Sequence, residues 1–145
     1  MHTFTDAIGE EWAITLDTTL CREIRSATKV DLLALDKDSM ASLISDDAML
    51  VDVLSLACTD QIRLRKLDER GFARRLVNDA LDNALEALIG ELVFICRQAS
   101  KRKVMQAAWD KAKQAVEKLN QHATALLESE QMDRELDKLI QQHGL

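Results

Sequence analysis

Proline is absent from this chain, and glycine is scarce. The 145 residues contain no proline, four glycines and no tyrosine. Proline often marks the loops and edge strands of all-β folds, so its absence argues against a β-sandwich and for long helices. Hydrophobic residues make up 47% of the chain, which is enough for one packed core at this length. We therefore expect one mainly α-helical domain, alone or with a tail.

Paired cysteines and long apolar runs are also missing. Cys21, Cys58 and Cys96 are far apart, and no CxxC pair occurs. This pattern indicates small buried side chains in a reducing compartment, with a three-thiol metal site as the alternative. No apolar run is long enough to span a membrane, and no signal-peptide pattern opens the chain. We expect a cytoplasmic protein with no metal, no cofactor and no membrane partner.

The N-terminal stretch predicts a β-hairpin. Apolar and polar residues alternate over residues 11–16, as in a strand with one buried face, and residues 6–9 have turn chemistry. Phe4 is expected opposite Trp12 or Ile14, since such cross-strand pairs are favourable. An isolated hairpin is marginal in water, so this one must lie on helices. The alternative is a frayed N-terminus anchored by a single tryptophan.

Capping residues divide the next part of the chain into helices. Helices are expected after Asp17, near Met40, from Ala48, and after Asp68 and Asn78. The helix from Ala48 is apolar on more than one side, which predicts a place at the centre of the domain.

Three segments carry more specific expectations. Residues 30–35 are apolar and should form a short buried connection. Over residues 60–70 the helix either continues to Lys66 or breaks near residue 60. Gly90 costs about 1 kcal/mol in a helix interior relative to alanine, which predicts a close crossing by another helix at that point.

The predicted domain boundary is at residues 99–100. Residues 1–99 form the hairpin and helical domain, and residues 100–145 form a C-terminal arm of one long helix, or two with a bend near Ser129. One face of the arm carries five residues that we take as the candidate partner-binding site: Met105, Trp109, Ala112, Val116 and Leu119. This stripe either packs on its own domain or presents a surface to another protein, and methionine suits an adaptable binding surface.

No group of residues has the spacing of a catalytic or metal site. The histidines His2, His122 and His143 have no suitable ligand near them in sequence and are expected at the surface. We therefore predict no enzyme activity and no catalytic residue. Residues 61–113 carry 12 basic and 7 acidic side chains, but the whole chain has a net charge of −6. Nucleic-acid binders usually have a net basic domain, so this class is disfavoured.

Several short motifs resemble the tail assembly chaperones of long-tailed bacteriophages. The similarity covers about residues 3–98 and lies in these segments: Phe4-Thr5-Asp6, Gly9, Glu11-Trp12, Ile14 and Leu16; Arg22-Glu23-Ile24-Arg25; Val30-Asp31-Leu32-Leu33; Leu50-Val51-Asp52-Val53-Leu54; Phe72-Ala73; and Asn78-Asp79-Ala80. Those proteins begin with a short hairpin followed by a small helical domain. The arm lies outside the resemblance.

The resemblance implies a non-enzymatic role in tail assembly. Such chaperones are thought to coat the tape-measure protein while the tail tube forms, and a longer frameshifted form recruits tube subunits. The expected partners are thus the tape-measure protein, tube subunits and further copies of this chain, in the host cytoplasm. The main alternative is a structural or regulatory helical module that self-associates without a client. A nucleic-acid-binding regulator is the third possibility.

Overall fold

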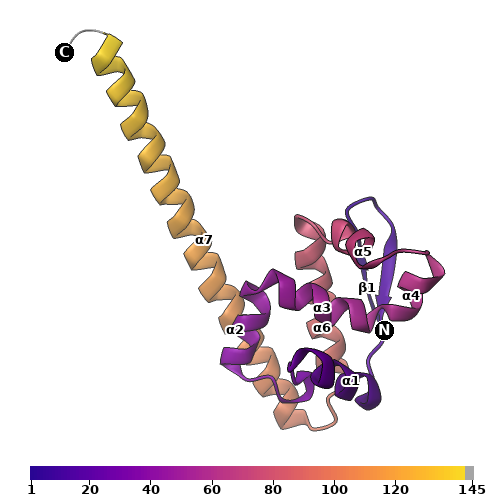
Figure 1. Cartoon of the computed structure of the whole chain (residues 1–145). Coiled ribbons are helices and arrows are strands. Elements are labelled where there is room, and N and C mark those ends of the chain that lie inside the picture. The colour runs from indigo at the N-terminus through magenta and orange to yellow at the C-terminus, as the bar shows by residue number, and fades with distance from the viewer. Residues whose placement is uncertain (143–145) are drawn as a thin grey trace. The chain divides into compact units, whose positions relative to one another are not determined.

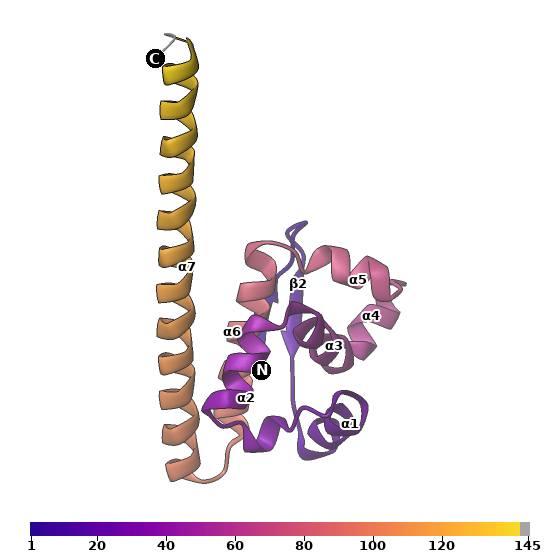
Figure 2. The same ribbon diagram turned by 60° about the vertical axis from the view of Figure 1, so that its left-hand side comes forward.

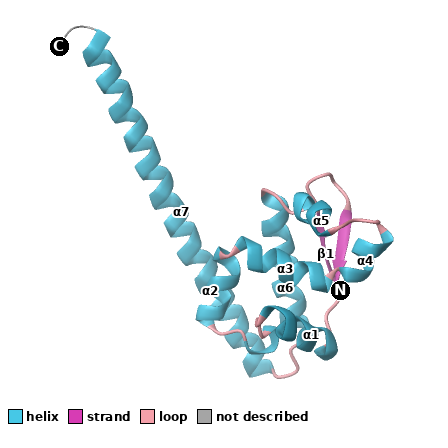
Figure 3. Ribbon diagram, viewed as in Figure 1, coloured by secondary structure: helices cyan, strands magenta, loops and turns pink. Residues whose placement is uncertain are grey.

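The chain begins with two strands and continues with helices alone in the part that the structure describes, residues 1–142. In this computed structural model the elements are β1 (His2–Thr5), β2 (Glu11–Ile14), α1 (Thr18–Thr28), the 3-10 helix η1 (Leu32–Ala34), α2 (Lys37–Ser45), α3 (Asp47–Ala57), α4 (Thr59–Leu64), α5 (Glu69–Arg75), α6 (Asp79–Ile95) and α7 (Ala99–Gln142) (Figure 1). The predicted fold class is confirmed: a short hairpin, a small helical domain and a long C-terminal helix (Figure 3).

The chain forms two compact units. The first comprises Met1–Ala112 and the second Lys113–Leu145. α7 begins in the first unit and continues into the second without a break at Ser129. The sequence predicts the boundary at residues 99–100, but the first unit extends to Ala112. The difference arises because the first turns of α7 pack into the core of the first unit.

The hairpin packs on helices, as predicted. β1 and β2 are antiparallel with Phe4 opposite Trp12, and their rings stack with centroids 6.5 Å apart. Trp12 and Ile14 are fully buried, and Phe72 of α5 meets the Trp12 ring edge-on at 5.0 Å. The strands contact α6 (Figure 2). The burial of these aromatic side chains stabilises a hairpin whose two strands would be only marginally stable alone.

A buried carboxylate holds the hairpin turn. Oδ1 of Asp6 accepts hydrogen bonds from the backbone N–H groups of Ile8 and Glu10, at 3.0 and 2.9 Å. Its Oδ2 accepts one from Nε1 of Trp12 at 2.8 Å and lies 3.3 Å from the guanidinium of Arg75. Burial alone would raise the pKa of the Asp6 carboxyl, but these hydrogen bonds outweigh it and lower the pKa below its usual value.

Two arginines tie the hairpin to α4 and α5. Arg75 pairs with Glu10 as well as Asp6, and its carbonyl accepts the N–H of Ala7 at 2.9 Å. Arg65 lies over the Trp12 ring, with its guanidinium carbon 3.9 Å from the ring centroid. Gln61 of α4 adds two bonds to the backbone of Ala13. The basic residues that follow Asp60 in the sequence therefore include two with structural roles.

α3 lies at the centre of the first unit, as predicted. It contacts α1, α2, α4, α5 and α6 (Figure 2), and its Leu50, Val53 and Leu54 are buried. The chain breaks at Cys58 and starts again as α4, which ends before Lys66 at a φ of 55°. This resolves the choice left open over residues 60–70 in favour of a break.

Aspartates cap most of the helices at the expected places. The side chains of Asp17, Asp36, Asp46 and Asp68 each accept a backbone N–H of the first turn. Asn78 precedes α6 but makes no such bond, and its φ is 55°. The prediction of a side-chain cap there is wrong. Asn78 turns the chain with a positive φ, and its side chain accepts no backbone N–H of the first turn.

Gly90 marks a close approach, but not by a helix. A Cβ built at Gly90 would lie 2.8 Å from Cδ2 of His2, on β1. The prediction of a helix crossing is therefore wrong, and the neighbour is the strand. His2 is not a free surface histidine either: its Nδ1 lies 2.7 Å from Oε2 of Glu91, which is 2% exposed.

Glu91 is a second buried carboxylate with partners from the hairpin. Its Oε1 accepts the N–H of Leu16 at 3.4 Å, and Oε2 lies 3.3 Å from the Met1 nitrogen as well as bonding His2. Burial raises the pKa of Glu91, but the bonds from His2, Leu16 and Met1 outweigh it, and the pKa is lowered. α6 thus contacts this part of the chain at two positions. Gly90 leaves room for the His2 ring, and the Glu91 carboxylate accepts hydrogen bonds.

The pairing of Gly90 with His2 predicts a background-dependent mutation. Gly90→Ala should gain about 1 kcal/mol of helix propensity, but in the wild-type protein its methyl group displaces the His2 ring. We expect little or no net stabilisation there, and the full gain in a His2→Ala background, by urea unfolding. Equal effects in both backgrounds would contradict the contact.

The lowered pKa of Asp6 predicts an acid-dependent loss of stability. A carboxyl whose folded pKa lies below its unfolded value, about 3.9, contributes stability above that value and loses it as pH falls through the folded pKa. We expect Asp6→Asn to be less stable than wild type at pH 7. The gap in free energy of unfolding should narrow as the pH is lowered below about 4. Urea unfolding monitored by circular dichroism measures it, and a gap independent of pH would exclude this role.

Candidate interaction surface on α7

The five predicted partner-binding residues divide into two groups. Met105, Trp109 and Ala112 are 6%, 8% and 3% exposed and belong to the hydrophobic core of the first unit. Val116 is half-buried, and Leu119 is 68% exposed. Only the last part of the predicted stripe is therefore available as a surface in this structure.

The physical reason lies in the core of the first unit. Residues 1–98 do not enclose it alone, and Met105, Ala108, Trp109 and Ala112, at i, i+3, i+4 and i+7, cover it from α7. The sequence pattern itself is correct, since an amphipathic stripe exists. Sequence spacing cannot show whether a stripe contacts its own domain or another molecule.

Residues 113–142 of the second unit form a helix with large exposed apolar side chains. Leu119 and Leu126 are 68% and 53% exposed, and the others are Leu127, Met132, Leu136, Leu139 and Ile140. Exposed apolar side chains do not make a helix more soluble. Where they are contiguous, they commonly mark interaction sites.

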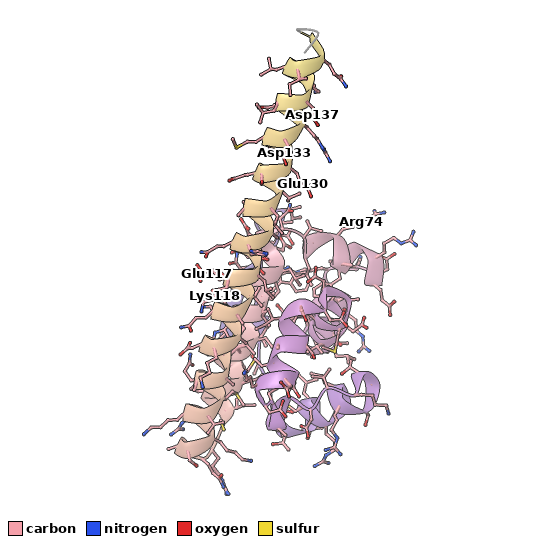
Figure 4. The ribbon with its side chains drawn as sticks, turned by 90° about the vertical axis from the view of Figure 1, so that its left-hand side faces the viewer. Arg74, Glu117, Lys118, Glu130, Asp133 and Asp137 are labelled. Atoms are coloured by element: carbon pink, nitrogen blue, oxygen red, sulfur yellow. The ribbon has the colours of Figure 1, made fainter. Side chains whose placement is uncertain are left out.

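One line of residues along α7 changes from apolar to acidic. Val116, Leu119, Ala123 and Leu126 recur at alternating steps of three and four, and the same steps then reach Glu130, Asp133 and Asp137. We call this the seam of α7. Figure 4 shows the three carboxylates spaced along the C-terminal part of the helix. A helix that binds this seam would match it with apolar residues followed by basic ones.

Two cysteines and two carboxylates of the first unit are buried in its interior. Burial raises the pKa of the Cys21 thiol to about 11 and that of Cys58 to about 12, so neither forms a thiolate near neutral pH. Asp6 and Glu91, which sequence analysis did not identify as buried, are each saturated by donors of the hairpin. The only sequence signal for Asp6 is its position at the start of the turn.

Residues 1–142 contain neither a cluster of metal ligands nor a helix that could span a membrane. This part of the chain has no group of three or more His, Cys, Asp or Glu side chains that could hold a metal ion. None of its helices combines the length and apolarity needed to cross a bilayer. His122 is exposed on α7, and His143 lies outside the described residues.

The division of the stripe predicts opposite outcomes for two alanine substitutions. Trp109→Ala empties a core position and should lower the free energy of unfolding by about 3–5 kcal/mol. Leu119→Ala, at an exposed position of the same helix, should change it by less than about 0.5 kcal/mol. Urea unfolding followed by circular dichroism compares the two, and equal effects would place Trp109 outside the core.

Comparison with known proteins identifies no related protein with which this surface could be compared. The sequence matches no protein-family model, and no curated protein or solved structure is significantly similar to it.

Proposed function

We propose that this chain is a non-enzymatic binding protein that shields an amphipathic helix of a client with the seam of α7. The observation that carries the proposal is the exposure of Leu119 and Leu126, 68% and 53%, at coiled-coil spacing on one helix face. Burying a leucine side chain contributes about 1.5–3 kcal/mol. Two such residues, with Val116 and Ala123 beside them, give a short helical seam enough affinity to hold a partner weakly and reversibly.

The seam also specifies the chemistry of the client. A helix laid along it meets Leu119 and Leu126 first and then Glu130, Asp133 and Asp137, which are exposed. The matching client helix has apolar residues at steps of three and four followed by lysine or arginine. A long helical protein that would otherwise aggregate through its apolar stripe fits this description.

The resemblance of residues 3–98 to phage tail assembly chaperones supports a specific version of the proposal. In that version the client is a tape-measure protein, tail tube subunits are further partners, and the chain acts in the cytoplasm of a host cell. The hairpin and the small helical domain then serve as the base from which the seam is presented. The alternative is a self-associating helical module without a client, and its support is the same exposed surface.

The first test is co-expression of the full chain with a long helical tape-measure candidate, followed by size-exclusion chromatography. We expect the client to become soluble and to co-elute with the wild-type chain. Leu119→Asp and Leu126→Asp should each abolish co-elution, since they place a carboxylate in the seam. The matched control is Leu64→Asp on α4, where a leucine that is more exposed still (81%) lies outside the seam.

Two outcomes would contradict the proposal. If the client stays insoluble beside a folded wild-type chain, the chaperone function fails and the structural module becomes the better description. If the seam variants capture the client as well as Leu64→Asp does, the binding surface lies elsewhere. If the chain binds plain duplex DNA, and this binding weakens steeply with added salt, the nucleic-acid-binding regulator is favoured instead.

A further inference from the structure

A second apolar stripe lies near the C-terminal end of α7, on a different side of the helix from the seam. Met132, Leu136, Leu139 and Ile140, at i, i+4, i+7 and i+8, are 64%, 54%, 51% and 46% exposed. At 100° per residue their mean direction is roughly 140° around the axis from that of Val116 to Leu126. We call them the terminal stripe. A helix seated in the seam leaves this stripe uncovered.

Acidic residues border the terminal stripe. Helical spacing places Glu128 and Glu135 along the edge of the stripe that lies away from the seam. The two basic residues of this segment, Arg134 and Lys138, fall on the opposite side of the helix. The stripe therefore requires an apolar groove with a positively charged rim.

The first unit has a groove of this description. It has a volume of about 290 Å³ and is lined by Leu33, Ala34, Leu35, Ser100, Lys101, Val104 and Met105. Its wall is mainly apolar, and Leu33 and Val104 remain 39% and 64% exposed. Lys101 is the one charged residue of the lining. Arg97, Arg102 and Lys103 do not line the groove, but they are exposed and make the segment of residues 97–103 strongly basic. Leu35 and Met105, both 6% exposed, form the floor.

From this complementarity we propose that the terminal stripe of one copy docks into the Leu33–Val104 groove of a second copy. The apolar side chains of the stripe cover Leu33 and Val104, and its acidic edge faces Lys101 and the basic segment of residues 97–103. The two surfaces are different patches of the same chain, so the contact is heterologous. Each copy then offers one groove and one stripe, and assembly continues to a closed ring or an open filament.

This inference does not depend on the client proposed above, because it uses a different side of α7. A chain of copies linked in this way presents many seams in series. A long client helix can bind several of them at once, which raises its overall affinity without any new type of contact.

The test mixes two full-length variants that each lack one half of the contact. Leu33→Asp with Val104→Asp blocks the groove and leaves the stripe. Leu136→Asp with Leu139→Asp blocks the stripe and leaves the groove. All four positions are at least 39% exposed, and circular dichroism checks that both variants fold. Sedimentation velocity then measures mass against concentration.

The wild-type chain should grow in mass with concentration, and each variant alone should associate about 100-fold more weakly or remain a monomer, as expected for a carboxylate placed among buried leucines. An equimolar mixture should form a one-to-one complex, because one groove and one stripe remain intact. A wild-type monomer at all concentrations, a variant that associates as well as wild type, or a mixture that stays monomeric would each overturn the proposal.

A charge exchange provides a second, gentler test. Lys101→Glu and Glu135→Lys should each weaken association about two- to fivefold, and the two changes in one chain should restore it. The wild-type association should also weaken with added salt. Failure of the double variant to recover, with both single variants weakened, would show that these two charges do not face each other across the interface and would remove the docking mode. Binding of a client by the seam, tested with Leu119→Asp, is a separate measurement, so either proposal can fail alone.

Discussion

The first unit depends on a hairpin that cannot stand alone. Two four-residue strands bury little surface between themselves, and they gain stability by enclosing Trp12 between Phe4 and Phe72 and by packing on α6. That burial is possible because Asp6 accepts the indole N–H and two turn amides at once. The same carboxylate faces Arg75, so the turn, the aromatic cluster and α5 are held by one acceptor. Loss of a partner from such a buried network leaves several donors unsatisfied together.

Local chemistry predicted the elements of this fold well. The alternation over residues 11–16 identified the strand, and the aspartates at positions 17, 46 and 68 identified helix starts, because capping needs only a side chain and the next turn of backbone. The apolar width of α3 indicated its central place. Properties that depend on distant neighbours were not predictable: Gly90 signalled a close approach, but only the three-dimensional structure shows that the neighbour is His2. Glu91 looked like an ordinary helical glutamate for the same reason.

The candidate site shows the same limit more sharply. The spacing of Met105, Trp109, Ala112, Val116 and Leu119 correctly describes one face of a helix. Burial divides that face between a core and an exposed surface at a point that sequence does not mark. The acidic end of the seam at Glu130, Asp133 and Asp137 was visible in the sequence. It acquired meaning only once Leu119 and Leu126 were known to be exposed on the same line.

The continuity of α7 couples the two units energetically. A single hydrogen-bonded helix runs from Ala99 to Gln142, and Trp109 contributes to the core near its start. Helices melt from their ends, and each ordered turn opposes fraying of the turn before it. Any partner that orders residues 113–142 therefore also suppresses local opening around Trp109, and amide protons there should exchange more slowly. If a partner binds residues 113–142, the core of the first unit therefore reports its binding, and the chain around Trp109 becomes more resistant to proteolysis.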